Sequence, residues 1–248
     1  EPELGPHIVT GPIAVRGARP GDTLEVEIID ITLDTDWGWS VHRPGFGTLP
    51  VEDFPDPWIR HLPIDRAAGT ARMPWGTELP LAPFFGILAV APAPAVGRVS
   101  SKPPDLHGGN MDNKELVAGS RVFLPVVTHG ALFSIGDGHA VQGDGEVNLT
   151  ALETCLTGTV RLTLHDGETI RAPRAITPNH YITHGFDPDL DRAAEDALRD
   201  MIRWLVELLD IRPDEAYMFA SLAVDLHVTQ LVDGNQGVHA MVRRSLVE

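Results

Sequence analysis

The sequence predicts a mainly β fold with a smaller C-terminal part that contains helices, and three observations support this prediction. The 248 residues include 24 glycines and 21 prolines, a composition that favours many turns and few long helices. Apolar and polar residues alternate in several short segments, which is the pattern of half-buried strands. Beyond residue 187 the apolar positions change to the spacing of an amphipathic helix.

The strands are expected in the first three quarters of the chain. At residues 24–28, Leu, Val and Ile alternate with two glutamates, as in a strand with one buried face. Residues 34–83 are rich in Asp, Pro, Gly and Trp without clear periodicity, so long loops with short strands are expected there. Further strands are expected at residues 11–17, 70–73, 84–90, 116–127, 131–135 and 160–164.

The C-terminal sixty residues predict a helix, a second helix and a β-hairpin. Apolar residues at 190–208 follow helical spacing, and Pro213 suits the first turn of the second helix. Alternating residues at 226–228 and 238–242 predict two strands joined by a glycine-containing turn. We therefore expect a β-rich part at residues 1–186, carrying the functional loops, and an α+β part at residues 187–248.

The charge of the chain restricts its partners. Thirty-five acidic and nineteen basic residues give a net charge of −16. Nucleic acid is therefore not expected as a partner, because phosphate binding needs a basic face, and an anionic membrane surface is disfavoured for the same reason. No segment approaches the length of a membrane-spanning helix, and no signal peptide is visible.

Cysteine content gives a prediction about the compartment. Cys155 is the single cysteine, so no intrachain disulfide can form and a cytoplasmic location is expected. This thiol has no basic neighbour in the sequence and is expected to be buried and inert. The chain begins at Glu1 without a methionine, so we expect that an N-terminal piece is missing or was cleaved.

Two polar, glycine-rich segments are expected to form loops that carry the functional site. They read HGGNMDN at residues 107–113 and GDGHAVQGDGE at residues 136–146. Asp137 and His139 are two residues apart, so an extended backbone would place both side chains on one side. With Asp112 from the first segment, they make a candidate metal site, and Glu146 follows after a glycine-rich reversal.

The residues alone leave the identity of this metal open. A single imidazole among carboxylates permits zinc, calcium or manganese. Aspartates in glycine-rich turns also commonly bond to their own backbone, and a lone histidine is more often structural than a ligand. The concentration of acids and a histidine beside several glycines nevertheless favours a functional site.

Longer motifs in the same region resemble the acetamidase/formamidase family. They are GGNMD at 108–112, LPV at 124–126, GALFSIGDGHA at 130–140 and QGDGEV at 142–147. The resemblance extends to PGDTLEV at 20–26, DWGW at 36–39 and PFFG at 83–86, and covers nearly the whole chain. Two departures are the absence of a preceding segment that contains histidine and acids, and Asn-Leu-Thr at 148–150 in place of Cys-Gly-Thr.

The resemblance implies a jelly-roll-like sandwich or barrel with a small α+β part. It also implies hydrolysis of short aliphatic amides to carboxylate and ammonia, by a homodimer or higher homo-oligomer. The hypothesis for the site makes Asp112, Asp137 and His139 metal ligands, Glu146 and Asp144 catalytic acids or bases, and Asn110, Gly108, Gly109 and Gln142 substrate-binding residues. The alternatives are a non-catalytic β-domain that binds a metal or small molecule, and a hydrolase of a different carboxamide.

Overall fold

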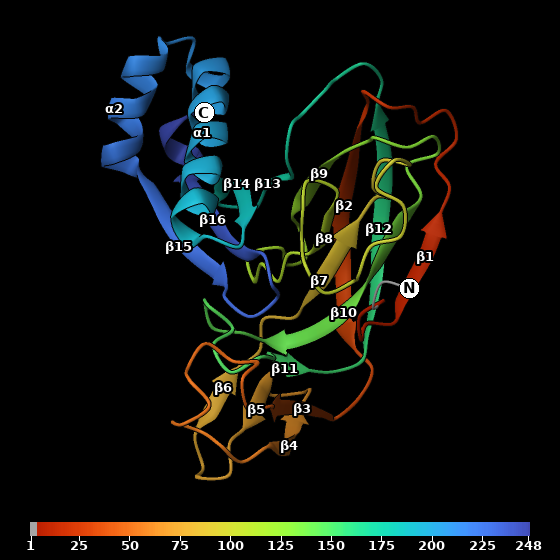
Figure 1. Cartoon of the computed structure of the whole chain (residues 1–248), viewed down its shortest axis with the longest axis vertical. Helices are drawn as coiled ribbons and strands as arrows, with labels where there is room; N and C mark the ends of the chain where they lie inside the picture. Colours follow the sequence, from red (N-terminus) through yellow and green to blue (C-terminus); the bar gives the residue numbers. More distant parts are fainter. Residues whose placement is uncertain (1–3) are drawn as a thin grey trace.

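The computed structural model describes residues 4–248 and confirms the mainly β prediction (Figure 1). Within that range, sixteen strands form two sheets in which neighbouring strands run antiparallel, and two helices lie near the C-terminus. Neither helix of the described chain has the length and apolar character required to cross a membrane.

The first sheet contains the strands formed by the two glycine-rich segments. Its strand order is β6-β5-β4-β3-β11-β10-β7-β8, with β1 added beside β10. Its strands are β1 (Val9–Ile13), β3 (Trp37–His42), β4 (Trp58–Asp65), β5 (Thr70–Arg72), β6 (Glu78–Pro80), β7 (Phe84–Ala89), β8 (Gly108–Asn110), β10 (Phe133–Val141) and β11 (Leu152–Glu153).

The second sheet continues from the β-rich part into the C-terminal part. Its strand order is β12-β2-β9-β13-β14-β16-β15. Its strands are β2 (Thr23–Leu33), β9 (Arg121–Pro125), β12 (Leu156–His165), β13 (Arg174–Ile176), β14 (His180–Asp187), β15 (Val224–Gln230) and β16 (Gln236–Arg243).

The two sheets pack face to face around one hydrophobic core. Leu24, Val26 and Ile28 of β2 are fully buried, as their alternation with glutamate predicts. They belong to the same cluster as Leu88 of β7 and Phe133 of β10, which come from the other sheet. Each such side chain contributes about 1.5–3 kcal/mol when it leaves water, so this interface holds the sandwich together.

Parts of both predicted glycine-rich loops are strands instead. The first includes β8, and the second begins inside β10, which the prediction ended at residue 135. A Cβ on Gly136 would lie 2.8 Å from the Ile8 carbonyl oxygen, and one on Gly138 would lie 2.7 Å from the Thr154 carbonyl oxygen. Glycine therefore stands here because neighbouring backbone approaches closely, and not because the chain turns.

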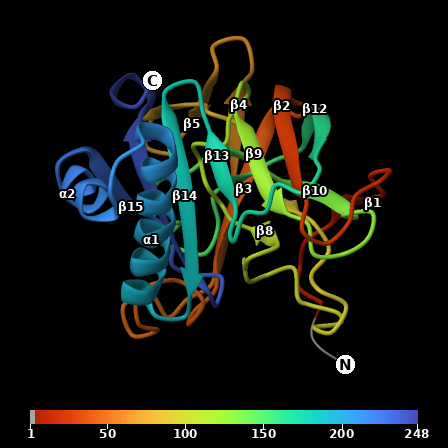
Figure 2. The same cartoon turned by 90° about the horizontal axis from the view of Figure 1, so that it is seen from above.

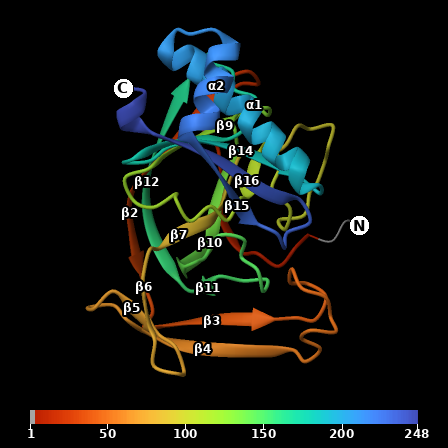
Figure 3. The same cartoon turned by 90° about the vertical axis from the view of Figure 1, so that its left-hand side faces the viewer.

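The segment 34–83 is also more regular than predicted. It contains β3 and the eight-residue strand β4, whose residues are mostly exposed. Exposure of β4 weakens the apolar alternation on which sequence prediction depends. Figure 3 shows β3 and β4 at the opposite end of the molecule from the two helices.

The C-terminal part has the predicted order of helix, helix and hairpin. Helix α1 (Leu190–Leu209) begins after Asp189, whose carboxylate accepts hydrogen bonds from two backbone amides of the first turn, and α2 (Pro213–Ala223) begins at the predicted proline. Helix α1 packs along β14 and β16 (Figures 1 and 2). The hairpin β15–β16 extends the second sheet through β14, and the expected division at residues 186 and 187 stays a prediction.

Candidate functional site

A cavity of about 860 Å³ lies beside β10 and contains a cluster of buried ionisable groups. Its apolar wall includes Trp37 and Trp39 of β3 together with Phe46. Its polar wall includes a group of five carboxylates around the imidazole of His139, which we call the acid cluster: Asp112, Asp137, His139, Glu146, Glu153 and Asp233. The volume falls within the range of about 300–1,000 Å³ typical of small-molecule sites.

His139 occupies the centre of the acid cluster and is almost completely buried. Its Nε2 lies 3.2 Å from Glu153 Oε2 and 3.4 Å from Asp137 Oδ2. Its Nδ1 lies 3.0 Å from Gln142 Oε1 and 3.9 Å from Asp112 Oδ1. Both ring nitrogens therefore face oxygens, and three carboxylates converge on the ring from β10, from β11 and from the loop after β8.

Three of these acidic residues have an uncommon backbone conformation with positive φ. Asp112, Asp137 and Glu146 have φ angles of 48°, 60° and 44°, in the left-handed region that side chains other than glycine rarely adopt. Such residues gather at functional sites, where the surrounding structure holds them in place. At Asp137 this conformation lies inside β10, and both Asp137 and His139 face the cavity.

Burial and the repulsion between neighbouring carboxylates raise the pKa of three acids of the cluster. Burial, with the neighbouring charges of Glu146 and Asp233, raises the pKa of Asp112 well above its usual value. Burial likewise raises the pKa of Glu146 well above its usual value and that of Asp233 to about 6. Although burial alone would lower it, Glu153 and Asp137 raise the pKa of His139 well above its usual value. These acids are therefore harder to ionise than usual, and a nearby positive charge would favour their charged forms.

Two features of the structure fit a cation in this cluster. Among residues 4–248, Asn110 Oδ1, Asp112 Oδ1, Glu146 Oε2 and Asp233 Oδ2 are buried without a hydrogen-bond partner. A Cβ on Gly86 of β7 would lie 2.3 Å from Asp112 Oδ1 and 2.6 Å from Asp137 Oδ2, so glycine leaves open the space where these oxygens meet. Buried oxygens without donors favour a positive ion, and the ligand groupings Asp112–His139–Glu146 and Asp137–His139–Glu153 share the imidazole.

The structure brings five of the predicted site residues to the cavity. Asn110 and the expected metal ligands line it together with Glu146, as the set Asn110, Asp112, Asp137, His139 and Glu146. They come from β8, from β10 and from the two loops that follow these strands.

The other four predicted residues do not line the cavity. Gly108 and Gly109 pair with β7, and the Gly108 amide donates to the Asp105 carbonyl oxygen, so it is not free to hold a substrate oxygen. Gln142 donates to the Asp112 carbonyl oxygen and contacts His139, which makes it a support for the site. Asp144 faces away, toward Lys114 at 3.1 Å.

Three residues of the site lie in segments whose sequence gives no indication of a functional role. Glu153 lies directly opposite His139 in the β10–β11 pairing, without a glycine-rich segment around it. Asp233 belongs to the predicted hairpin turn, where aspartate is ordinary. His7 Nε2 lies 3.9 Å from Asp137 Oδ2, from a segment distant in sequence. The prediction that Cys155 is buried is wrong, because its side chain is exposed and lies on the cavity wall.

Comparison with protein families decides the relationship. The acetamidase/formamidase family model matches residues 4–102 and 94–242, which is nearly the whole chain. The chain belongs to this family. The resemblance found from the motifs is thereby confirmed, and the glycine-rich segments with the acid cluster are features of a member of the acetamidase/formamidase family.

The curated relatives include a formamidase and an acetamidase. The formamidase of Methylophilus methylotrophus is 30% identical over 191 residues, or 57% of this chain and 47% of the relative. The acetamidase of Mycolicibacterium smegmatis is 31% identical over 207 residues, or 59% of this chain and 50% of the relative. The chain therefore spans about half the length of the curated relatives that it matches.

Solved structures of the family share the fold closely. An acetamidase from Bacillus halodurans is 33% identical with a TM-score of 0.89, over 96% of this chain and 79% of that one. An acetamidase from Yersinia enterocolitica is 31% identical with a TM-score of 0.90, over 98% of this chain and 75% of that one. A γ-lactamase from Delftia acidovorans, 23% identical with a TM-score of 0.63, shares the fold alone.

Proposed function

We propose that this chain hydrolyses short aliphatic amides, of the formamide and acetamide type, to carboxylate and ammonia in the cavity beside β10. The observation that carries the proposal is the group of buried, unpartnered oxygens around one imidazole, beside the space left by Gly86. Membership of the family and the names of the relatives support amides as the substrate class.

The reaction makes three chemical demands on the cavity. Resonance makes an amide carbonyl a poor electrophile, so the attacking water needs a base, the carbonyl oxygen needs stabilisation and the departing nitrogen needs a proton. Asp112, Asp137 and His139 are the groups that would hold a divalent cation, with zinc, manganese and calcium as candidates. Such a cation would supply a polarised carbonyl and a water of lowered pKa.

Glu146 is proposed to move the proton. Burial raises its pKa, so the carboxylate holds a proton more readily than usual and could take one from water and return it to the leaving nitrogen. Asn110 Oδ1 lacks a partner among the described residues and lines the cavity, so it is proposed to accept a hydrogen bond from the substrate amide. Gln142, which does not line the cavity, is proposed to hold His139 in place in preference to binding the substrate.

The decisive experiment measures ammonia release after Glu146→Gln. Loss of a positioned proton-transfer group is expected to lower turnover of formamide or acetamide by about 10²–10⁴-fold, and His139→Ala is expected to lower it at least as much. Glu78→Gln, an exposed glutamate of β6, is the matched control and is expected to keep full activity. Wild-type turnover by both Glu146→Gln and His139→Ala would remove the site assignment.

A substrate panel separates the remaining candidates. The cavity is much larger than acetamide and has two tryptophans on its wall, which favours testing propionamide and an aromatic amide beside the two small amides. Faster hydrolysis of the larger amides would identify a hydrolase of a different carboxamide. Cation binding without ammonia release from any amide would indicate a binding domain in place of an enzyme.

We also propose that the chain forms a homodimer or higher homo-oligomer in the cytoplasm, in line with the family resemblance and the single cysteine. Light scattering of the purified protein measures the first proposal directly, and a monomer at micromolar concentration would contradict it.

A further inference from the structure

A row of three histidines crosses the C-terminal end of the second sheet, outside the cavity. His227 of β15 lies opposite His239 of β16, and His239 lies opposite His184 of β14. The rings of His227 and His239 stack with centroids 5.1 Å apart and planes 11° from parallel. This row places two imidazoles from different strands within reach of one ligand.

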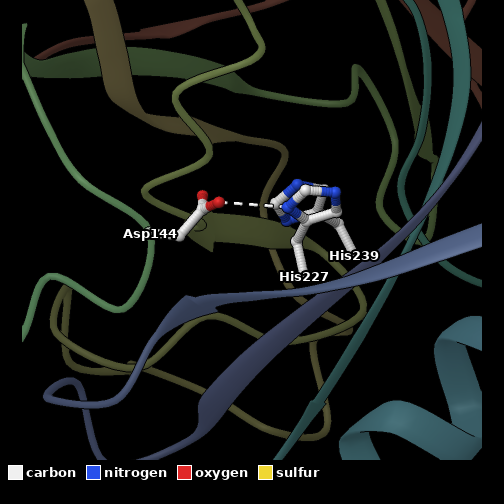
Figure 4. A group of neighbouring side chains, drawn as sticks. All are labelled: Asp144, His227 and His239. Atoms are coloured by element: carbon white, nitrogen blue, oxygen red, sulfur yellow. Dashed lines mark hydrogen bonds and ion pairs between the residues drawn. The ribbon is translucent and has the colours of Figure 1, made fainter.

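Asp144 completes a group with two of these histidines (Figure 4). Its Oδ2 lies 3.0 Å from His227 Nδ1, and one ligand atom from each of Asp144, His227 and His239 lies within 4.8 Å of the others. His184 is not part of the group, because its Nδ1 bonds to the Pro173 carbonyl oxygen and its Nε2 to the Asn113 amide.

His239 offers a nitrogen that the rest of the described chain leaves unused. The side chain is fully buried, and Thr229 Oγ1 lies 2.7 Å from its Nδ1. Its Nε2 is buried and has no hydrogen-bond partner in residues 4–248. A buried nitrogen without a partner costs about 1–3 kcal/mol, so it indicates a ligand that binds there. A hydrogen bond to the other ring nitrogen is the usual support for a metal-binding histidine.

The backbone holds Asp144 in position against the two histidines. The Gly145 amide donates to the Thr229 carbonyl oxygen at 3.1 Å, and the Leu231 amide donates to the Gly145 carbonyl oxygen at 3.0 Å. These two bonds tie the loop that carries Asp144 to β15, the strand that carries His227. Asp144 and His227 are therefore adjacent before any ion binds, which lowers the cost of binding.

We infer that Asp144, His227 and His239 form a second metal site, separate from the cavity, which binds a divalent transition cation such as zinc. Two imidazoles and one carboxylate suit zinc, whereas the acid cluster offers one imidazole among five carboxylates. The 3.0 Å between Asp144 Oδ2 and His227 Nδ1 is close to the edge of about 3.3 Å expected for a zinc tetrahedron with bonds near 2 Å. Asp144 and His227 are partly exposed, which leaves a fourth position open to water.

Lys114 sets the strength of this site. Its Nζ lies 3.1 Å from Asp144 Oδ2 and balances the carboxylate when no cation is bound. A zinc ion must displace this ammonium group, which is partly exposed and free to swing into solvent. Removing the competing charge in Lys114→Met is expected to tighten zinc binding by about tenfold.

Zinc titration of the whole protein tests the site, with binding followed by calorimetry and by elemental analysis after dialysis. His227→Ala is the principal variant because this side chain is partly exposed and its loss does not open the core. It is expected to lose one zinc equivalent, or to bind that equivalent more than about 100-fold more weakly, beyond the usual effect of an outer-shell partner. His129→Ala, at an exposed histidine elsewhere, is the matched control and is expected to bind as the wild type does.

His139→Ala distinguishes this site from the cavity, because it disables the acid cluster and leaves the second site intact. Retention in His139→Ala of the equivalent that His227→Ala loses supports the second site, even if the protein proves inactive on amides. Wild-type zinc stoichiometry and affinity in His227→Ala would overturn the inference. Complete loss of zinc in a folded His139→Ala protein would overturn it as well.

Discussion

At the scale of single residues, His184 shows how burial selects one charge state. Its Nδ1–H donates to the Pro173 carbonyl oxygen at 3.0 Å, and its Nε2 accepts from the Asn113 amide at 2.8 Å. Burial lowers the pKa of His184 to about 4. Protonation would place an N–H against the donating amide of Asn113, so the folded protein holds this ring neutral.

Stability is therefore expected to fall as the pH drops below about 6.5. The unfolded chain has the ordinary pKa of 6.5, so it takes up the proton before the folded protein does. The difference between 6.5 and about 4 corresponds to about 3 kcal/mol, fully lost below about pH 4. Urea unfolding between about pH 7 and pH 4 measures this loss, and His184→Asn is expected to remove this part of the slope. An identical slope in the variant would contradict the prediction, while His129→Ala serves as the control.

Some residues of the candidate site could be predicted from local sequence, and others are brought there only by the tertiary fold. Asp137 and His139 could be placed together from sequence because they lie two residues apart in one strand, although the left-handed φ of Asp137 departs from the extended backbone that the prediction assumes. Glu153 reaches His139 through strand pairing, and Asp144 leaves the cavity because its loop is tied to β15. Strand pairing and loop attachment join segments that are distant in the sequence, so local sequence patterns do not predict them.

At the scale of elements, the contact between β14 and α1 depends on one glycine. A Cβ on Gly185 would lie 2.0 Å from the Ala193 carbonyl oxygen and 2.6 Å from the Ala197 amide nitrogen. Both atoms belong to the helix backbone, which has no flexible end to move aside. The missing side chain is what lets the helix lie directly on the strand.

Gly185→Ala is accordingly expected to lower the free energy of unfolding by about 1–3 kcal/mol, the usual cost of overpacking a core. The measurement is the urea midpoint or the melting temperature of the purified variant. Gly143→Ala is the matched control, because nothing lies within 4 Å of a Cβ at that position. Equal stability of the two variants would show that the helix shifts without cost.

Elements with strong periodicity were predictable, and exposed or glycine-lined elements were not. Helix α1 and strand β2 follow their apolar spacing, because each buries one continuous face. Strand β10 continues past residue 135 through two glycines that read as turn residues, and β4 is largely exposed. In both cases the reason for the strand is the neighbouring backbone, which a single segment does not reveal.

At the scale of the whole molecule, uncompensated negative charge is expected to make stability depend on cations. The chain has a net charge of −16, and the acid cluster concentrates part of it in a buried cavity. An ion that binds only the folded protein stabilises it by about 2.7 kcal/mol at a free concentration one hundred times its dissociation constant.

The melting temperature is therefore expected to rise with added zinc or manganese and to fall after treatment with a chelator. In Gly86→Ala, the added methyl group fills the space between Asp112 Oδ1 and Asp137 Oδ2, so the part of the rise due to the acid cluster is expected to disappear. His227→Ala separates the contribution of the second site. A melting temperature of the wild type that is indifferent to both cation and chelator would contradict the prediction.

Cys155 gives the cavity a chemical handle. It is the single cysteine of the chain, it is exposed, and it lies on the cavity wall. A maleimide dye would therefore attach at one defined position, without any engineered mutation. Protection of that thiol from alkylation would report occupancy of the cavity in real time, for ligands that undergo no reaction at all.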